Sequence, residues 1–236
     1  MNEKKAFLFL LALSLISITA LSAQQKEREL TVEELYLKSI EAQILREKAF
    51  SDDQDMKMGA LDDIEKMADE GGAAAEGPVF VLEYLAMEGV NRRVHESNRL
   101  INYFPEVRRR AANLLGRLGG EQAKNTLITV LITDDEPMVK AEAAYALGVI
   151  GKNEDYRSSD AIVFMLNRED SEKPDNNFAF AICLAFEKIA KANGGFKDYK
   201  KAAPVYSALI RIAQGNYIRT VKQKALQTLD ELKKYQ

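Results

Sequence analysis

The chain has 236 residues, of which 47% are hydrophobic and 29% are charged, and its formal net charge is −3. The apolar share is too high for an intrinsically disordered chain, and a chain of this length can bury a substantial core. The charge balance gives no sign of a nucleic-acid partner, because proteins that bind nucleic acids usually carry a strongly basic domain.

The first 23 residues have the pattern of an export signal. A basic head at Lys4 and Lys5 precedes an apolar stretch, and small residues stand at Ala20 and Ser22. We expect cleavage after Ser22 or Ala23, which would make the mature protein periplasmic or extracellular. The alternative is an uncut membrane anchor, although the apolar run is short for the ~20 residues that a membrane span needs.

The next segments predict two helices. Residues 31–50 form the first, and Thr31 with Glu34 is the pair expected of a capping box at its start. The aspartates in residues 52–55 lack the spacing of a calcium loop. They are better interpreted as the acidic start of the second helix, where the helix dipole favours negative charge.

The most informative feature is a repeated pattern in the middle of the chain. Residues 107–119 read VRRRAANLLGRLG and residues 139–151 read VKAEAAYALGVIG, so Ala-Ala and Leu-Gly recur at a spacing of 32 residues. A period of this size indicates stacked helical units. We expect Leu147 and Ile150 to be buried on one helical stripe and the final glycine of each copy to adopt a positive φ. The segment Asp134-Asp135-Glu136-Pro137 supplies an N-cap candidate and a proline suited to the first turn of the helix.

Weaker copies of the same pattern begin at Met56, Phe178 and Val221. Another apolar helical segment stands in each gap between copies, over residues 78–88, 122–133, 158–167 and 202–214. With the first helix, this gives about five helix pairs. Segment 89–106 is longer than a minimal repeat requires, and we expect an extra half-turn of helix there.

The two central copies resemble HEAT repeats of the short subtype named for phycobilisome bilin lyases. That family's pattern is D-x-x-P-x-V-R-x-x-A-A-x-x-L-G-x-x-G. It is matched in the second copy by Asp134, Pro137, Val139, Lys140, Ala143, Ala144, Leu147, Gly148, Ile150 and Gly151, with lysine for the usual arginine. The first copy matches too, with Asn102 where the acid is expected. The resemblance implies an all-α fold, a right-handed α–α solenoid of about five HEAT-like helix pairs, with residues 24–236 as a single domain.

The sequence offers no residues arranged for catalysis, a cofactor or a metal. Cys183 is the only cysteine, which excludes an intramolecular disulfide, and it is interpreted as a small buried hydrophobe. His95 is the only histidine and is interpreted as a surface residue. Structural zinc needs several Cys or His ligands. Because repeats of this type also occur in many binding scaffolds, the resemblance does not imply an enzyme.

Seven arginines and no lysine lie between residues 92 and 117. One interpretation is a surface for an anionic partner, such as an acidic protein. The other is that Arg108 pairs with an acid of a neighbouring repeat, as the resemblance implies, while the remaining arginines form a solvated face. The cluster comprises Arg92, Arg93, Arg99, Arg108, Arg109, Arg110 and Arg117.

The repeat also predicts a binding surface. On the second helix of each pair, pattern positions 3, 7 and 11 lie opposite the core stripe and should line a concave groove. In the middle of the series these positions are apolar and aromatic, with arginines at one border, as is typical of protein partner sites. The residues expected to contact the partner are Arg109, Asn113, Arg117, Tyr145, Val149, Phe180 and Leu184. The alternative for Phe180 and Leu184 is sideways packing into the next repeat.

The sequence therefore predicts an exported, non-catalytic scaffold or adaptor that binds a protein in its groove. Two alternatives stay open: an envelope-attached subunit of a structural assembly, and a lyase-type enzyme that acts on a bound pigment. We expect no cofactor, no metal and no nucleic acid. Contact with a membrane is expected only if the N-terminal segment is uncut.

Overall fold

The computed structural model describes residues 31–70, 76–91, 93–169 and 171–235, so the predicted signal segment lies outside the described residues. The chain divides into residues 1–42 and residues 43–236. This boundary falls inside the first described helix, α2 (Val32–Phe50). The predicted capping box at its start is confirmed, because Thr31 N donates to Glu34 Oε2 at 2.8 Å and Glu34 N donates to Thr31 Oγ1 at 3.2 Å.

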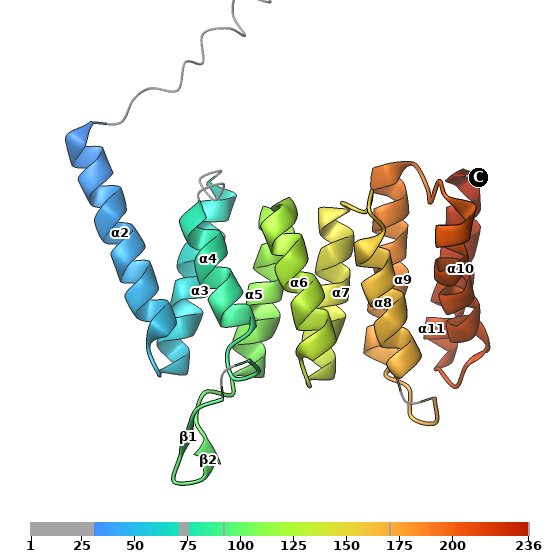
Figure 1. The fold of residues 1–236 in the computed structure, drawn as a ribbon, viewed down its shortest axis with the longest axis horizontal. Coiled ribbons are helices and arrows are strands. Elements are labelled where there is room, and N and C mark those ends of the chain that lie inside the picture. Colours follow the sequence, from blue (N-terminus) through green and yellow to red (C-terminus); the bar gives the residue numbers. More distant parts are fainter. Residues whose placement is uncertain (1–30, 71–75, 92, 170, 236) are drawn as a thin grey trace, which may run out of the picture. The chain divides into compact units, whose positions relative to one another are not determined.

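The rest of the described chain is a series of helices in consecutive pairs (Figure 1). After α2 come α3 (Gln54–Asp69), α4 (Glu76–Ala86), α5 (Pro105–Leu118), α6 (Gly120–Thr133), α7 (Pro137–Ile150), α8 (Arg157–Arg168), α9 (Asn176–Asn193), α10 (Tyr199–Gln214) and α11 (Arg219–Leu232). A short 3₁₀ helix follows at Lys233–Tyr235. The five pairs α2–α3, α4–α5, α6–α7, α8–α9 and α10–α11 confirm the predicted organisation.

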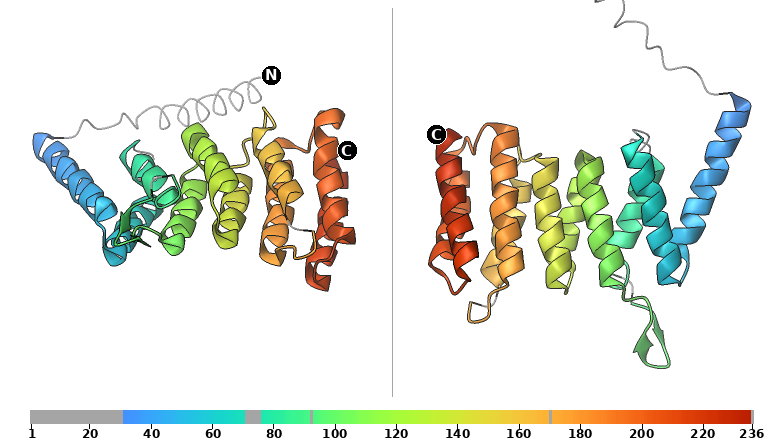
Figure 2. Two further views of the ribbon diagram at one scale, coloured as in Figure 1. Left: turned by 60° about the horizontal axis from the view of Figure 1, so that its bottom comes forward. Right: turned by 180° about the vertical axis from the view of Figure 1, so that it is seen from behind.

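The helices of residues 43–236 form two layers (Figures 1 and 2). The second members of the pairs, α3, α5, α7, α9 and α11, pack side by side in one layer, and we call them the second helices. Helices α4, α6, α8 and α10 pack side by side in the other layer. Neighbours in sequence are therefore neighbours in space, which makes the fold an all-α solenoid. None of the helices in the described segments is long and apolar enough to cross a membrane.

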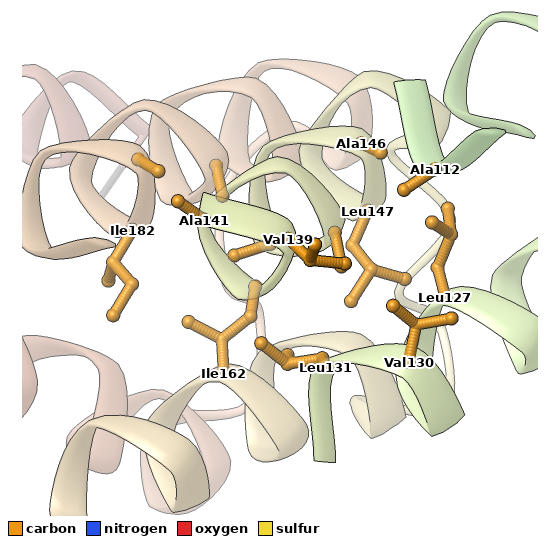
Figure 3. Packing of buried hydrophobic residues seen from close by; sticks show 14 of the residues in the cluster. Ala112, Leu127, Val130, Leu131, Val139, Ala141, Ala146, Leu147, Ile162 and Ile182 are labelled. Atoms are coloured by element: carbon orange, nitrogen blue, oxygen red, sulfur yellow. The ribbon is translucent and has the colours of Figure 1, made fainter. Parts of the chain in front are cut away.

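The hydrophobic core lies between the two layers. Figure 3 shows Val139 and Leu147 of α7 packed against Val130 and Leu131 of α6, with Ile162 of α8 beside them. All five side chains are almost fully buried, as the helical stripe predicts for Leu147. Burial of such a side chain contributes about 1.5–3 kcal/mol, so this stripe holds consecutive pairs together.

Several helix ends follow the local signals in the sequence. Gly119 and Gly151 each adopt a φ of +70° at the ends of α5 and α7, a conformation that costs glycine little. Asp53 caps α3, since its side chain accepts hydrogen bonds from the backbone N–H groups of Asp55 and Met56. The acidic cluster is thus the start of a helix, as interpreted.

One prediction for the start of α7 holds and one for its end was wrong. Glu136, within the predicted segment, is the N-cap, and Pro137 is the first residue of α7. The Glu136 N–H donates to Asp134 Oδ1. Ile150 is only half-buried, because it is the last residue of α7 and the chain leaves the helix at Gly151.

Neighbouring second helices contact each other at the same position of the repeat pattern. If the first apolar residue of each copy is position 1, position 10 is Gly116 in α5 and Gly148 in α7. A Cβ on Gly116 would lie 2.7 Å from Ala146 Cβ, and a Cβ on Gly148 would lie 2.6 Å from Ala185 Cα. Contacts this short leave no room for any side chain, so α5, α7 and α9 touch nearly backbone to backbone.

Glutamate stands at position 10 in the two outer contacts of the series. Glu65 of α3 accepts hydrogen bonds from Arg110 at 2.6 Å and Arg117 at 2.7 Å, both on α5. Glu187 of α9 accepts hydrogen bonds from Lys224 and Thr228 of α11, each at 2.7 Å. These outer contacts are therefore joined by long polar side chains.

The segment between α4 and α5 forms a β-hairpin, which corrects the predicted half-turn of helix. Strands β1 (His95–Glu96) and β2 (Arg99–Leu100) pair antiparallel, with His95 opposite Leu100. The connecting residues Ser97 and Asn98 have φ values of 47° and 63°, as two-residue hairpin turns require. Figure 1 shows the hairpin projecting beyond the ends of the neighbouring helices.

Candidate functional site

A groove of about 420 Å³ crosses α5, α7 and α9. Its lining comes from positions on the second helices that lie opposite the core stripe. Helix α5 contributes Arg109 and Asn113, α7 contributes Met138, Ala141, Glu142 and Tyr145, and α9 contributes Asn177, Phe180, Ala181 and Leu184. We call it the α5–α7–α9 groove.

The floor of the groove is apolar. Ala141 and Ala181 are buried, with 4% and 8% of their surfaces exposed, and small residues suit helices that the Gly148 contact holds close together. Tyr145 and Phe180 are half-buried and pack against the core, while Leu184 is half-buried. These side chains therefore contact the protein on one side and the groove on the other.

The rim of the groove is polar, and its charges are compensated. Arg109 Nε donates to Glu106 Oε2 at 3.0 Å, and its Nη1 lies 3.8 Å from Glu142 Oε2. Asn113 Nδ2 donates to the same Glu142 carboxylate at 2.8 Å. The hydrogen bond between Arg109 and Glu106 raises the pKa of Arg109 and lowers the pKa of Glu106. Both groups consequently stay charged at neutral pH.

A cation lies over the aromatic ring at the middle of the groove. Lys188 Nζ is 5.1 Å from the centroid of the Tyr145 ring. Such cation–π contacts are worth about 0.5–1 kcal/mol at exposed sites. The contact orients the Tyr145 ring across the boundary between α7 and α9.

Comparison with known proteins identifies the repeat. Residues 98–175, a third of the chain, match the family of HEAT repeats, and both central copies of the pattern lie inside this segment. Residues 98–175 therefore form HEAT repeats. No curated protein matches the sequence. Among solved structures, a chain of the complex of CpcE and CpcF of phycocyanin lyase from Nostoc sp. PCC7120 is 16% identical, with a TM-score of 0.44. That match covers 90% of this chain and 94% of the other.

The HEAT repeats explain the most buried arginine. Arg108 is fully buried, and it donates from Nε to Asp134 Oδ2 at 2.7 Å and from Nη2 to Asp134 Oδ1 at 3.2 Å. The Tyr103 ring lies 4.6 Å from its guanidinium carbon. The interpretation of Arg108 as a scaffold cation paired with an acid of the next repeat is confirmed.

The other arginines with described side chains also face acids. Arg110 contacts Asp62 and Glu65 at 2.6 Å each, and Arg117 contacts Glu65 and Asp69. Arg93 contacts Asp135 at 2.8 Å. Arg92 and the side chain of Arg99 lie outside the described residues. The described part of the cluster is therefore neutralised within the chain, and α3 supplies the acids for Arg110 and Arg117.

The groove brings together five of the seven residues predicted to bind a partner: Arg109, Asn113, Tyr145, Phe180 and Leu184. Arg117 and Val149 do not line it; Arg117 turns towards α3, and Val149 is 41% exposed near the end of α7. Four groove residues were not predicted from the sequence: Met138, Glu142, Asn177 and Ala181. Met138 and Asn177 stand one helical turn before position 3, so extending the stripe by a turn would have found both.

Two further residues have the environments that the sequence predicted. Cys183 is fully buried, and this burial raises the pKa of its thiol to about 12, which disfavours the reactive thiolate. His95 is exposed on the hairpin. Within the described segments, no group of three or more His, Cys, Asp or Glu side chains is arranged to hold a metal ion.

Proposed function

We propose that this HEAT-repeat protein is an exported, non-catalytic scaffold that binds a protein partner in the α5–α7–α9 groove. One observation carries the proposal: an apolar floor with Tyr145, Phe180 and Leu184 is surrounded by polar side chains. Protein interfaces combine an apolar centre with a polar rim, and they are enriched in aromatic residues, methionine and arginine. Met138, 57% exposed at the groove, adds an adaptable side chain of this kind.

The rim favours a partner that supplies an apolar anchor and hydrogen bonds. An acidic partner would have to compete with Glu106 and Glu142 for Arg109, which weakens the case for a strongly acidic surface. Asn177 is exposed on the groove, and an amide can both donate and accept hydrogen bonds. A partner segment that places an apolar side chain near Tyr145 can bond its backbone to such amides.

Export rests on the sequence of the first 23 residues. Their basic head, apolar stretch and small residues form the pattern that secretory cleavage sites require. The absence of an intramolecular disulfide is compatible with export, since the buried core between the two helix layers stabilises the chain without one.

The test compares two aromatic residues that each lie beside a cation and that belong to opposite layers. Tyr145 lies in the groove under Lys188, whereas Phe164 of α8 is 49% exposed with Arg168 5.5 Å from its ring centroid. The full-length precursor is expressed with a C-terminal tag, and proteins that co-purify are identified by mass spectrometry. The partner should co-purify with wild type and Phe164→Ala but be depleted with Tyr145→Ala.

Titration of the purified partner then gives the magnitude. Loss of a binding hot spot costs about 2 kcal/mol or more, so Tyr145→Ala should weaken binding roughly 30-fold while unfolding free energy falls by only about 1 kcal/mol. Equal binding by both variants would refute the groove as the site. N-terminal sequencing of the same material tests export separately, because a chain that keeps Met1 was not processed.

A further inference from the structure

The last second helix exposes a side chain at a position that is buried in every earlier one. Position 6 of the repeat is fully buried, at 0% exposure, in Leu61, Ala112, Ala144 and Cys183 of α3, α5, α7 and α9. The equivalent residue of α11, Leu226, is 53% exposed. The position is buried elsewhere because another second helix follows, and in the described chain none follows α11.

Helix geometry shows which way this face points. Lys224 and Thr228 face α9, because both bond Glu187. Successive helical residues are rotated by about 100°, so Leu226, two residues from each, lies on the side away from α9. Lys222 lies on that same side. The open face of α11 therefore carries Leu226, with Lys222 one turn before it and Asp230, which pairs with Lys233, one turn after it.

The two ends of the row of helices carry opposite charge. Residues 197–236, the last pair with its flanking segments, contain nine Lys or Arg and three Asp or Glu, a net of +6. Residues 43–70, at the opposite end of this unit, contain nine Asp or Glu and four Lys or Arg, a net of −5. Three of these acids, Asp62, Glu65 and Asp69, are paired with Arg110 and Arg117 of α5, so the remaining six acids supply the negative charge of this end. Each end also exposes apolar side chains: Tyr199 and Leu226 at the basic end, Ile44 and Met56 at the acidic end.

We propose that the basic end of one copy docks on the acidic end of a second copy, head to tail. Opposite charge favours this pairing, whereas two basic or two acidic ends would repel each other. The outer contacts within the chain already use the same chemistry, with Glu65 bonded to Arg110 and Glu187 bonded to Lys224. A head-to-tail contact uses two different surfaces, so it continues into open chains of copies or closes into a ring.

This contact is independent of the α5–α7–α9 groove, so either proposal can fail without the other. The free charges best suited to a test are exposed and have no ion pair among the described interactions. At the basic end, Arg219 is exposed and Lys222 is half-buried, and neither forms a described ion pair. At the acidic end, Glu47 and Asp52 are exposed and likewise form no described ion pair. The basic-end variant is Arg219→Glu with Lys222→Glu, and the acidic-end variant is Glu47→Lys with Asp52→Lys.

Sedimentation velocity of the purified chain, over a range of concentrations at low salt, is the measurement. The wild type should rise above the mass of one chain as concentration increases, and each variant should associate at least 10-fold more weakly. An equimolar mixture of the two variants should regain association, because each supplies an end that fits the other. The control Arg168→Glu with Lys173→Glu makes the same change of charge between α8 and α9 and should associate like wild type.

Three outcomes overturn the proposal. Wild type that stays at the mass of one chain over the whole range excludes it. Association that is lost only in the basic-end variant indicates a tail-to-tail contact. Wild type that does not self-associate, yet sediments with vesicles containing anionic lipid through Arg219 and Lys222, assigns the basic end to a membrane surface. Circular dichroism of each variant verifies that it is folded.

Discussion

The inner and outer contacts between second helices solve the same problem differently. At position 10, α5 and α7 carry Gly116 and Gly148, which let the next helix approach to van der Waals distance at an alanine. At the same position, α3 and α9 carry Glu65 and Glu187, which bond cationic side chains of the next helix. The difference shows that one repeat pattern can be joined by shape in the middle and by charge at the periphery. The groove lies where the joints are made by shape.

The largest expected effect comes from filling an inner joint. Gly148→Ala places a Cβ 2.6 Å from Ala185 Cα, and overpacking of this kind costs about 1–3 kcal/mol. Gly59→Ala in α3 is the matched control, because no atom lies within 4 Å of its Cβ. There alanine should stabilise the helix by up to about 1 kcal/mol. Urea denaturation should therefore show a lower unfolding free energy for Gly148→Ala and a higher one for Gly59→Ala. Changes of the same sign in the two variants would contradict an inner joint made by close packing.

A smaller effect is expected at the outer joint between α9 and α11. Lys224 and Glu187 are 18% and 23% exposed, so Lys224→Met should lower the unfolding free energy by about 1 kcal/mol. A double-mutant cycle with Glu187→Gln isolates the coupling of the pair. Because ions screen charge over about 3 Å at 1 M salt, the coupling should shrink in high salt while the cost of Gly148→Ala does not. A coupling free energy that stays the same in high salt would contradict an electrostatic contact between Lys224 and Glu187.

The smallest effect concerns pH at another contact of the last pair. Tyr217 OH donates to Glu169 Oε2 at 2.6 Å, and burial raises the pKa of Glu169 above its ordinary value of 4.5. The folded state therefore holds this proton more tightly than the unfolded state does. The contribution of Glu169 to stability is fully present below pH 4.5 and is lost as pH rises through the folded pKa.

The corresponding variant is Glu169→Gln, which does not titrate. As the pH rises from 4 to 7, the unfolding free energy of wild type should fall relative to that of this variant. Thermal unfolding in a pH series measures it, and the difference is the quantity to compare, since other carboxyl groups titrate in both chains. A difference that stays constant would show that Glu169 is not perturbed by folding.

Much of the fold could be predicted because its signals are local. The apolar stripe that includes Leu147, the terminal glycines and the capping box act within one or two helical turns, so the sequence contains them completely. The five pairs follow because each stripe must be covered by a neighbouring helix. The hairpin was missed although Ser97 and Asn98 are residue types that turns favour, because its strands are too short to show an alternating pattern.

The candidate site was predicted only in part, because its properties depend on distant residues. The sequence left two interpretations of the arginines open, an anion-binding surface and a solvated face. In the structure, Arg110 and Arg117 are neutralised by acids more than forty residues away in sequence. Spacing alone could not reveal those partners. Phe180 and Leu184 illustrate a second limit: helical position predicted their direction, whereas the depth to which the next helix covers them depends on the Gly148 contact.

The hairpin between α4 and α5 gives this chain a place where its length can change. Its base is closed by the hydrogen bonds from Ile101 N to Val94 O at 3.0 Å and from Val94 N to Asn102 Oδ1 at 2.9 Å, so the chain returns to the helices where it left them. Each doubling of a loop costs only about 0.6 kcal/mol in closure entropy. Residues added between Ser97 and Asn98, including a fluorescent reporter domain, would therefore be carried outside the stack without altering its register.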